Sequence, residues 1–127
     1  MSRIYIAGPM RGHELFNFPA FFKASIQLRS IGLEPINPAE YDMALGMDPG
    51  KPMEDQGWTR EECLQRDFKL VCSCDWIALL DGWEKSDGVR RELKVAKTQG
   101  ILPRSLEIIL KAPEDYMVRH FAEVSHG

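Results

Sequence analysis

The chain has 127 residues, 44% of them hydrophobic and 28% charged, which predicts one domain, residues 1–127, with a single core. Its net charge of −3 lacks the basic excess that a general nucleic-acid-binding face requires. No apolar run is long enough to span a membrane and no signal-peptide core is present, so we expect a cytoplasmic protein. The three cysteines lack zinc-ligand spacing, and the histidines His13 and His120 are isolated, so we expect reduced, mostly buried thiols and no metal site.

The first third of the chain predicts a strand, a helix and a second strand. Residues 3–7 are rich in β-formers and end at a Gly-Pro pair, which indicates a strand. Asn17 is expected to cap a helix that runs up to Gly32, and residues 33–37 return as a strand before a proline. This order and spacing predict a right-handed parallel βαβ unit. The expected helical stripe consists of Phe18, Phe21, Phe22, Ile26 and Leu28.

Residues 38–58 show no regular hydrophobic pattern. Three methionines are scattered among Asp, Pro, Gly and Lys, which predicts a long loop after the second strand. A lid over a ligand site and plain disorder are both open interpretations. A helix is expected to begin at Thr59, where Thr-Arg-Glu-Glu fits a capping box.

Residues 76–80 form a short apolar run that predicts a buried strand, and residues 89–99 predict a helix closed by Gly100. Ser86 and Gly88 therefore lie where a strand turns into a helix. At such a turn of an open α/β sheet, free backbone N–H groups point outward and bind anions.

The hydrophobic pattern is weaker beyond Gly100. Residues 101–102 and 106–110 offer one or two further strands, and Pro113 starts a last expected helix. The alternation of strands and helices predicts an α/β fold, a three-layer sandwich with a parallel, flavodoxin-like (Rossmann-like) sheet. The apolar residues of the last helix are Tyr116, Met117, Val118, Phe121 and Val124.

Two carboxylates interrupt the apolar stripes of helices. Asp67 stands between Leu64 and Val71, and Glu92 shares a stripe with Val89. A single acid in such a place is compatible with a capped structural role. Because unpaired buried charge is costly, two acids on the helices either side of one strand indicate a functional site.

The chain resembles the nucleoside 2-deoxyribosyltransferase superfamily and, within it, is most similar to 2'-deoxynucleoside 5'-phosphate N-hydrolases and related small phage-type proteins. The resemblance covers roughly residues 3–100, and the ordered set of motifs is more specific than any one of them. The motifs are Tyr5-Ile6-Ala7-Gly8-Pro9-Met10-Arg11-Gly12, the acid Asp67 eight residues before Asp75, the strand that follows, and Ser86-x-Gly88-x-x-x-Glu92.

The resemblance implies an enzyme that hydrolyses the N-glycosidic bond of a 2'-deoxynucleoside 5'-monophosphate without a cofactor. By this likeness Glu92 is the nucleophile at C1', Asp67 orients it or handles the leaving group's proton, and Tyr5 positions the nucleophile or the sugar. The chemistry is that of a retaining glycosidase, in which a covalent intermediate divides the displacement into two steps. An early helical turn is expected to favour the ionised form of Glu92.

Ser86 decides between two branches of the superfamily, the phosphate-using hydrolases and the transferases for free nucleosides. By the resemblance, phosphate-using hydrolases carry a serine six residues before the nucleophile, where transferases for free nucleosides carry an aspartate. A serine hydroxyl at a helix N-terminus suits a phosphate, to which Arg11 adds charge. Against this, Asp87 would repel a phosphate if its side chain points inward. Two roles remain open for Trp83, stacking on a base and filling a surface groove. The expected substrate-binding residues are Gly8, Pro9, Met10, Arg11, Gly12, Trp83, Ser86 and Gly88.

Two other functions remain open, deoxyribosyl transfer between bases at the same site and a non-catalytic nucleotide-binding module. Arg11, Asp67 and Glu92 together speak against the module, because a pure binder has no need of a buried carboxylate beneath C1'. Without the motif, the alternation of the strand favours Tyr5 as a plain core residue, and a solvated charge is an open interpretation of Arg11. The expected partner is a small deoxynucleotide, with no nucleic-acid polymer and no membrane, and the likeness implies a homodimer.

Overall fold

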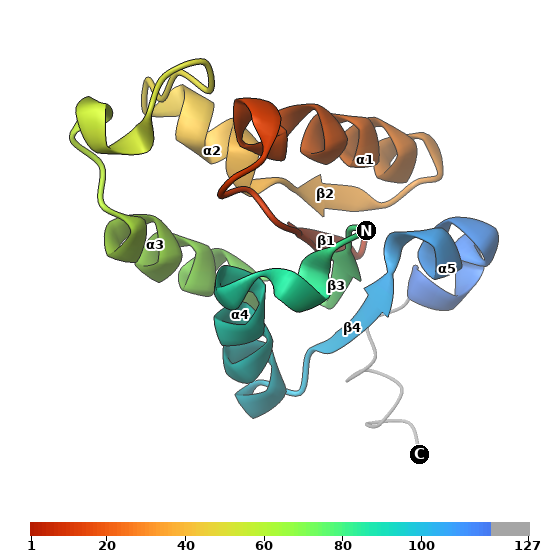
Figure 1. Ribbon diagram of the computed structural model, residues 1–127. Helices are drawn as coiled ribbons and strands as arrows, with labels where there is room; N and C mark the ends of the chain where they lie inside the picture. Colours follow the sequence, from red (N-terminus) through yellow and green to blue (C-terminus); the bar gives the residue numbers. More distant parts are fainter. Residues whose placement is uncertain (118–127) are drawn as a thin grey trace.

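Four parallel strands form one sheet in the order β2-β1-β3-β4, with helices on both faces (Figure 1). The structure, a computed structural model, describes residues 1–117. The strand order is that of a flavodoxin-like sheet, so the predicted α/β class and parallel sheet are confirmed. The strands are β1 Arg3–Ala7, β2 Glu34–Ile36, β3 Trp76–Leu79 and β4 Leu102–Ser105.

The helices divide between the two faces of the sheet. Buried residues of α1, α2 and α5 join one core cluster, and buried residues of α3 and α4 join the other. The helices are α1 Phe18–Ser30, α2 Pro38–Ala44, α3 Arg60–Cys72, α4 Asp87–Thr98 and α5 Leu106–Lys111. Three 3-10 helices, η1 Glu14–Asn17, η2 Met53–Gln56 and η3 Trp83–Lys85, lie in the connections, and η4 Pro113–Tyr116 follows α5 as the last described element.

Strand β1 lies at the centre of the sheet and distributes its side chains between the two cores. Ile4 and Ile6 pack on the α1 side, whereas Tyr5 and Ala7 pack on the side of α3 and α4. This alternation is the ordinary period of two of a strand. It directs the phenol of Tyr5, which is fully buried, toward the two helices that carry the predicted acids.

The predicted loop at 38–58 is wrong for much of its length, because it contains α2 and η2. The side chain of Asn37 caps α2 by accepting a hydrogen bond from the Ala39 N–H at 2.9 Å, and Pro38 occupies the first helical position. Asp48 lies between these two helices, and the side chain of Gln56, the last residue of η2, accepts a hydrogen bond from the Asp48 N–H at 2.6 Å and donates one to the Asp48 carbonyl oxygen at 2.9 Å. This segment is tied to itself and does not form a continuous loop.

The expected strand at 106–110 is also wrong, since these residues belong to α5. The Ser105 hydroxyl accepts a hydrogen bond from the Ile108 N–H at 3.3 Å and so caps this helix. The last expected helix begins as a 3-10 helix, η4, that ends at Tyr116. Val118, Phe121 and Val124, with His120, lie outside the described residues.

Several helix boundaries and exposures differ from the predictions. Asn17 precedes α1 but does not cap it with its side chain, because its backbone is left-handed and its amide donates to the Pro9 carbonyl at 2.9 Å. Ile26 of the predicted stripe is 67% exposed. The thiol of Cys72 is exposed, against the expectation of mostly buried thiols. No helix within residues 1–117 is both long and apolar enough to cross a membrane.

Candidate active site

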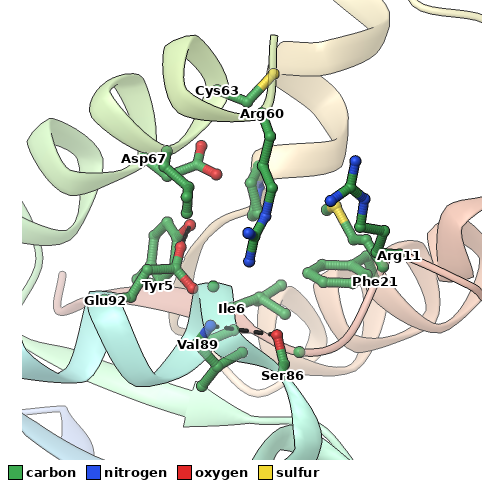
Figure 2. Close-up of a pocket in the computed structure, with 16 residues that line it drawn as sticks. Tyr5, Ile6, Arg11, Phe21, Arg60, Cys63, Asp67, Ser86, Val89 and Glu92 are labelled. Atoms are coloured by element: carbon green, nitrogen blue, oxygen red, sulfur yellow. Dashed lines mark hydrogen bonds between the residues drawn. The ribbon is translucent and has the colours of Figure 1, made fainter. Parts of the chain in front are cut away.

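A cavity opens where the carboxyl end of β1 meets α3 and α4, the edge at which open α/β sheets bind ligands (Figure 2). Its empty space, solvent at the mouth included, is about 660 Å³. The Cβ of any residue replacing Gly8 would lie 2.8 Å from the Leu80 Cβ, so glycine allows the loop after β1 to lie against the end of β3.

A cluster of Tyr5, Asp67 and Glu92 forms one side of the cavity. The Tyr5 hydroxyl donates a hydrogen bond to Oε2 of Glu92. Both acids are buried, with 8% of Asp67 and 6% of Glu92 exposed. The pattern of acids on apolar stripes therefore correctly predicted two buried carboxylates, and the structure brings them to one cavity.

Burial controls the protonation of this cluster. It raises the pKa of Glu92 to about 8, with a further increase from the negative charge of Asp67, and the Tyr5 hydrogen bond opposes both only in part. Burial likewise raises the pKa of Asp67 to about 6. The expectation that helix position favours ionised Glu92 is wrong. Helix α4 begins at Asp87, which puts Glu92 beyond the first turn, and desolvation outweighs the helix dipole.

Arg66 connects Asp67 to α2. Its guanidinium reaches Oδ1 of Asp67 through Nη2 at 2.6 Å and Nε at 3.0 Å, while Nη1 lies 2.5 Å from Oδ1 of the buried Asp42. The positive charge of Arg66 lowers the pKa of Asp67 against the stronger effect of burial. This network was not predicted, because an arginine on a polar helix face carries no periodic signal and Asp42 lay in the expected loop.

Ser86 and Gly88 lie at the N-terminus of α4 and line the cavity. The Ser86 hydroxyl oxygen caps the helix by accepting from the Val89 N–H at 3.2 Å, which leaves its hydrogen free to donate to a ligand. The Cβ of a side chain at position 88 would stand 3.5 Å from Leu64 and 3.7 Å from the Ser86 hydroxyl oxygen. Because both neighbours line the cavity, glycine keeps this corner open.

Two arginines provide positive charge to the cavity, Arg11 from the loop after β1 and Arg60 from the start of α3. Figure 2 shows the Arg60 side chain reaching down between the acidic cluster and the pair formed by Arg11 and Phe21. Arg60 Nη2 lies 2.7 Å from Oδ2 of Asp87. Arg60 was missed in the sequence, where it stands inside a capping box.

The structure brings most of the predicted site residues together and leaves three out. Pro9 is buried, Gly12 has an open left-handed backbone, and Trp83 packs against the core cluster on the α3 and α4 side. Predicted residues that line the cavity are Tyr5, Gly8, Met10, Arg11, Asp67, Ser86, Gly88 and Glu92. Lining residues not predicted are Ile6, Ala7, Phe21, Pro38, Arg60, Cys63, Leu64 and Val89.

The arrangement is suited to chemistry with two carboxylates. A carboxyl group with a pKa near neutrality exchanges protons readily, and two groups with different pKa values can divide the roles of nucleophile and proton donor. The opposite end of the cavity offers a hydroxyl, free helix N–H groups and guanidinium groups, which suit an anion. Within residues 1–117, no group of three His, Cys, Asp or Glu side chains is placed to hold a metal ion.

Comparison with known proteins identifies a family of undescribed activity. No curated protein matches the chain. A family model described as "Domain of unknown function (DUF4406)" matches residues 2–102, a range that contains every residue lining the cavity. The chain therefore belongs to the DUF4406 family.

Proposed function

We propose that this protein hydrolyses the N-glycosidic bond of a 2'-deoxynucleoside 5'-monophosphate, as a relative of the nucleoside 2-deoxyribosyltransferases. One observation carries the proposal. Glu92 is a buried carboxylate on a cavity wall, hydrogen-bonded by Tyr5 and next to Asp67, while the same cavity ends at the free N-terminus of α4. A nucleotide that places its phosphate at Ser86 puts its sugar toward these acids.

The chemistry follows from the two carboxyl groups. Ionised Glu92 attacks C1' with the oxygen that Tyr5 leaves free, the bond from C1' to the base nitrogen breaks, and its electron pair leaves with the base. Asp67 in its protonated form supplies the proton that the departing base needs. Water then attacks C1' of the glycosyl ester, Asp67 accepts its proton, and Glu92 is released together with deoxyribose 5-phosphate.

The anion end supports a phosphorylated substrate. Ser86 can donate its hydroxyl hydrogen, the Gly88 N–H is one of the first-turn groups without a helical partner, and Arg11 adds charge. The predicted repulsion by Asp87 is reduced, because this exposed carboxylate is paired with Arg60. The resemblance also favours a homodimer, which light scattering on the purified protein can check.

Incubation with each deoxynucleoside 5'-monophosphate and each free deoxynucleoside tests the proposal. Chromatography should detect free base and deoxyribose 5-phosphate from at least one monophosphate, and Glu92→Gln should lower the rate by several orders of magnitude. Absence of base release from every substrate would refute the proposal. A second free base added to the mixture distinguishes transfer, since a transferase would form a new nucleoside.

A further inference from the structure

An ion pair joins the first residue of α3 to the first residue of α4 at the edge of the cavity. Arg60 Nη2 lies 2.7 Å from Asp87 Oδ2, and the two side chains are 39% and 61% exposed. Exposed pairs of this kind are weak, so a stronger acceptor can compete for the guanidinium. Asp87 stands between Ser86 and Gly88 in the chain, so this pairing holds the Arg60 guanidinium at the N-terminus of α4.

The groups at this corner of the cavity act on an anion in opposite directions. The free N–H groups of α4 and the Ser86 hydroxyl attract an anion, whereas the Asp87 carboxylate repels one. Arg60 lines the cavity and forms an ion pair with Asp87. A guanidinium has five N–H donors in a fixed fork that matches phosphate oxygens, so a phosphate in the cavity offers Arg60 a better partner than one exposed carboxylate.

We propose that Arg60 is a specificity residue that recognises the anionic group of the ligand, and that Asp87 competes with this group for the guanidinium. A ligand without the anion leaves the ion pair intact and gains nothing from Arg60. A monophosphate displaces Asp87 and gains charge-assisted hydrogen bonds. This inference rests on the proposed function, because it takes the 5'-phosphate as the anion.

A double-mutant cycle measured by calorimetry tests the competition. The probes are inorganic phosphate and 2'-deoxyguanosine 5'-monophosphate, with Glu92→Gln in every protein so that the nucleotide is not consumed. Arg60→Ala should weaken binding of both probes about tenfold or more. Asp87→Asn should tighten it about two- to fivefold, the range of an exposed ion pair. In the Arg60→Ala background Asp87 has no guanidinium to compete for, so Asp87→Asn should give a smaller gain, from the screened repulsion of an exposed carboxylate alone.

A second ion pair between the same two helices supplies the control. Arg91 Nη2 lies 2.9 Å from Oε1 of Glu61, and neither residue lines the cavity. Glu61→Gln removes one negative charge and one bridge from α3 to α4, as Asp87→Asn does, and should leave the affinity for both probes unchanged. Circular dichroism and thermal melts confirm that each variant is folded.

The outcomes separate this inference from the proposed function. An equal or larger gain from Asp87→Asn in the Arg60→Ala background would show simple repulsion by Asp87 and overturn the competition. Nucleotide binding that Arg60→Ala leaves unchanged would overturn the role of Arg60 while the proposed function stands. If neither probe binds, the inference fails together with the phosphate end of the proposed site. A cycle with the expected values in a protein that releases no base would support the inference and refute the hydrolase.

Discussion

Tyr5 donates its phenolic hydrogen to Glu92 and thereby joins the central strand of the sheet to helix α4. Burial, with the nearby carboxylates, raises the pKa of Tyr5 well above its ordinary value, so the phenol stays protonated and remains a donor in neutral and mildly alkaline solution. The hydrogen bond occupies one oxygen of Glu92 and leaves the other available to the cavity. The same burial makes the ionised form of Glu92 costly, and the stability of the protein should reflect that cost.

We predict that Glu92→Gln raises the melting temperature by several degrees at about pH 9 and changes it little at about pH 4. The pKa of Glu92 is about 8 in the folded protein against an ordinary value of 4.5. Between these values the unfolded chain releases a proton that the folded chain keeps, so wild-type stability falls as pH rises, and glutamine does not titrate. Calorimetry at both pH values measures the difference, with the exposed Glu61→Gln as control. A larger gain at the acidic pH would contradict a raised pKa.

The acidic half of the site could be predicted from the sequence because it depends on local periodicity. Asp67 and Glu92 stand on apolar stripes, and a helix places such residues in the core regardless of what it packs against. Tyr5 follows from the alternation of one strand. For these residues, knowledge of the element was sufficient to place the side chain.

Apart from Arg11, the basic half of the site could not be predicted, because it depends on contacts between elements. Arg66 meets Asp42 only because α2 forms, and that helix of seven residues starts at a proline after a capping asparagine. Arg60 enters the cavity from a helix terminus, where periodicity says nothing about direction. The apolar run of α5 shows the same limit, since a short apolar segment does not distinguish a strand from a helix.

We predict a bell-shaped dependence of kcat/KM on pH, with limbs near pH 6 and pH 8. The pKa values of Asp67 and Glu92 are about 6 and about 8, so the pair holds one proton between them in this range. The proposed reaction needs that proton on Asp67 and needs Glu92 ionised, which is the minor singly protonated form because Glu92 has the higher pKa. Both requirements are met only in the singly protonated pair, so the profile keeps its bell shape. A profile that rises near pH 8 and does not fall would contradict the proton-donor role.

Asp67→Asn provides the control for this profile. The variant should be slow and should lose the alkaline fall, because only Glu92 then titrates. Its single rise should lie below pH 8, since the negative charge of Asp67 raises the pKa of Glu92 in the wild type. An unchanged bell in the variant would assign the limbs to other groups.

We predict that Arg66→Met slows base release and moves the acidic limb to higher pH. Arg66 lowers the pKa of Asp67 and holds its carboxylate with two donors, so its loss raises that pKa and frees the side chain. The single variant also leaves Asp42 buried without its cation, which is destabilising. The double variant with Asp42→Asn removes that penalty. It should recover stability but keep most of the shift of the limb, because Asp42 raises the pKa of Asp67 less than Arg66 lowers it. Full recovery of both would make Arg66 a structural residue.

We predict that deoxynucleotides are hydrolysed faster than the corresponding ribonucleotides. A 2'-hydroxyl withdraws electrons from the cation that develops at C1' and so raises the barrier. It also adds bulk beside Tyr5 and Glu92, which are held together by a hydrogen bond and leave little room to move. Initial rates on dCMP and CMP, and on dGMP and GMP, measure the preference. Equal rates within each pair would contradict it.

The last prediction concerns Ser86, which has two roles that substitution can separate. Its hydroxyl oxygen caps α4, and its hydrogen is free for a phosphate. Ser86→Ala should lose both, weakening nucleotide binding about tenfold and stability by about 0.5–2 kcal/mol. Ser86→Asp should retain the cap, because aspartate is an equally good cap, yet repel the phosphate. Binding of the free nucleoside should stay poor in Ser86→Ala and should improve, if anywhere, in Ser86→Asp.

Ser105→Ala is the matched control, since Ser105 caps α5 through the Ile108 N–H and does not line the cavity. It should lower stability by a similar amount and leave the affinity for the monophosphate unchanged. Every protein in this comparison carries Glu92→Gln, so that the nucleotide is not consumed. Calorimetry then titrates a monophosphate and its nucleoside into that parent protein and into its Ser86→Ala, Ser86→Asp and Ser105→Ala variants. If Ser86→Asp binds the monophosphate as well as the wild type does, the phosphate does not lie at the N-terminus of α4. In that case the serine is only a helix cap. Equal affinity of the wild type for the nucleoside and the monophosphate would make a free nucleoside the better candidate substrate and favour the transferase.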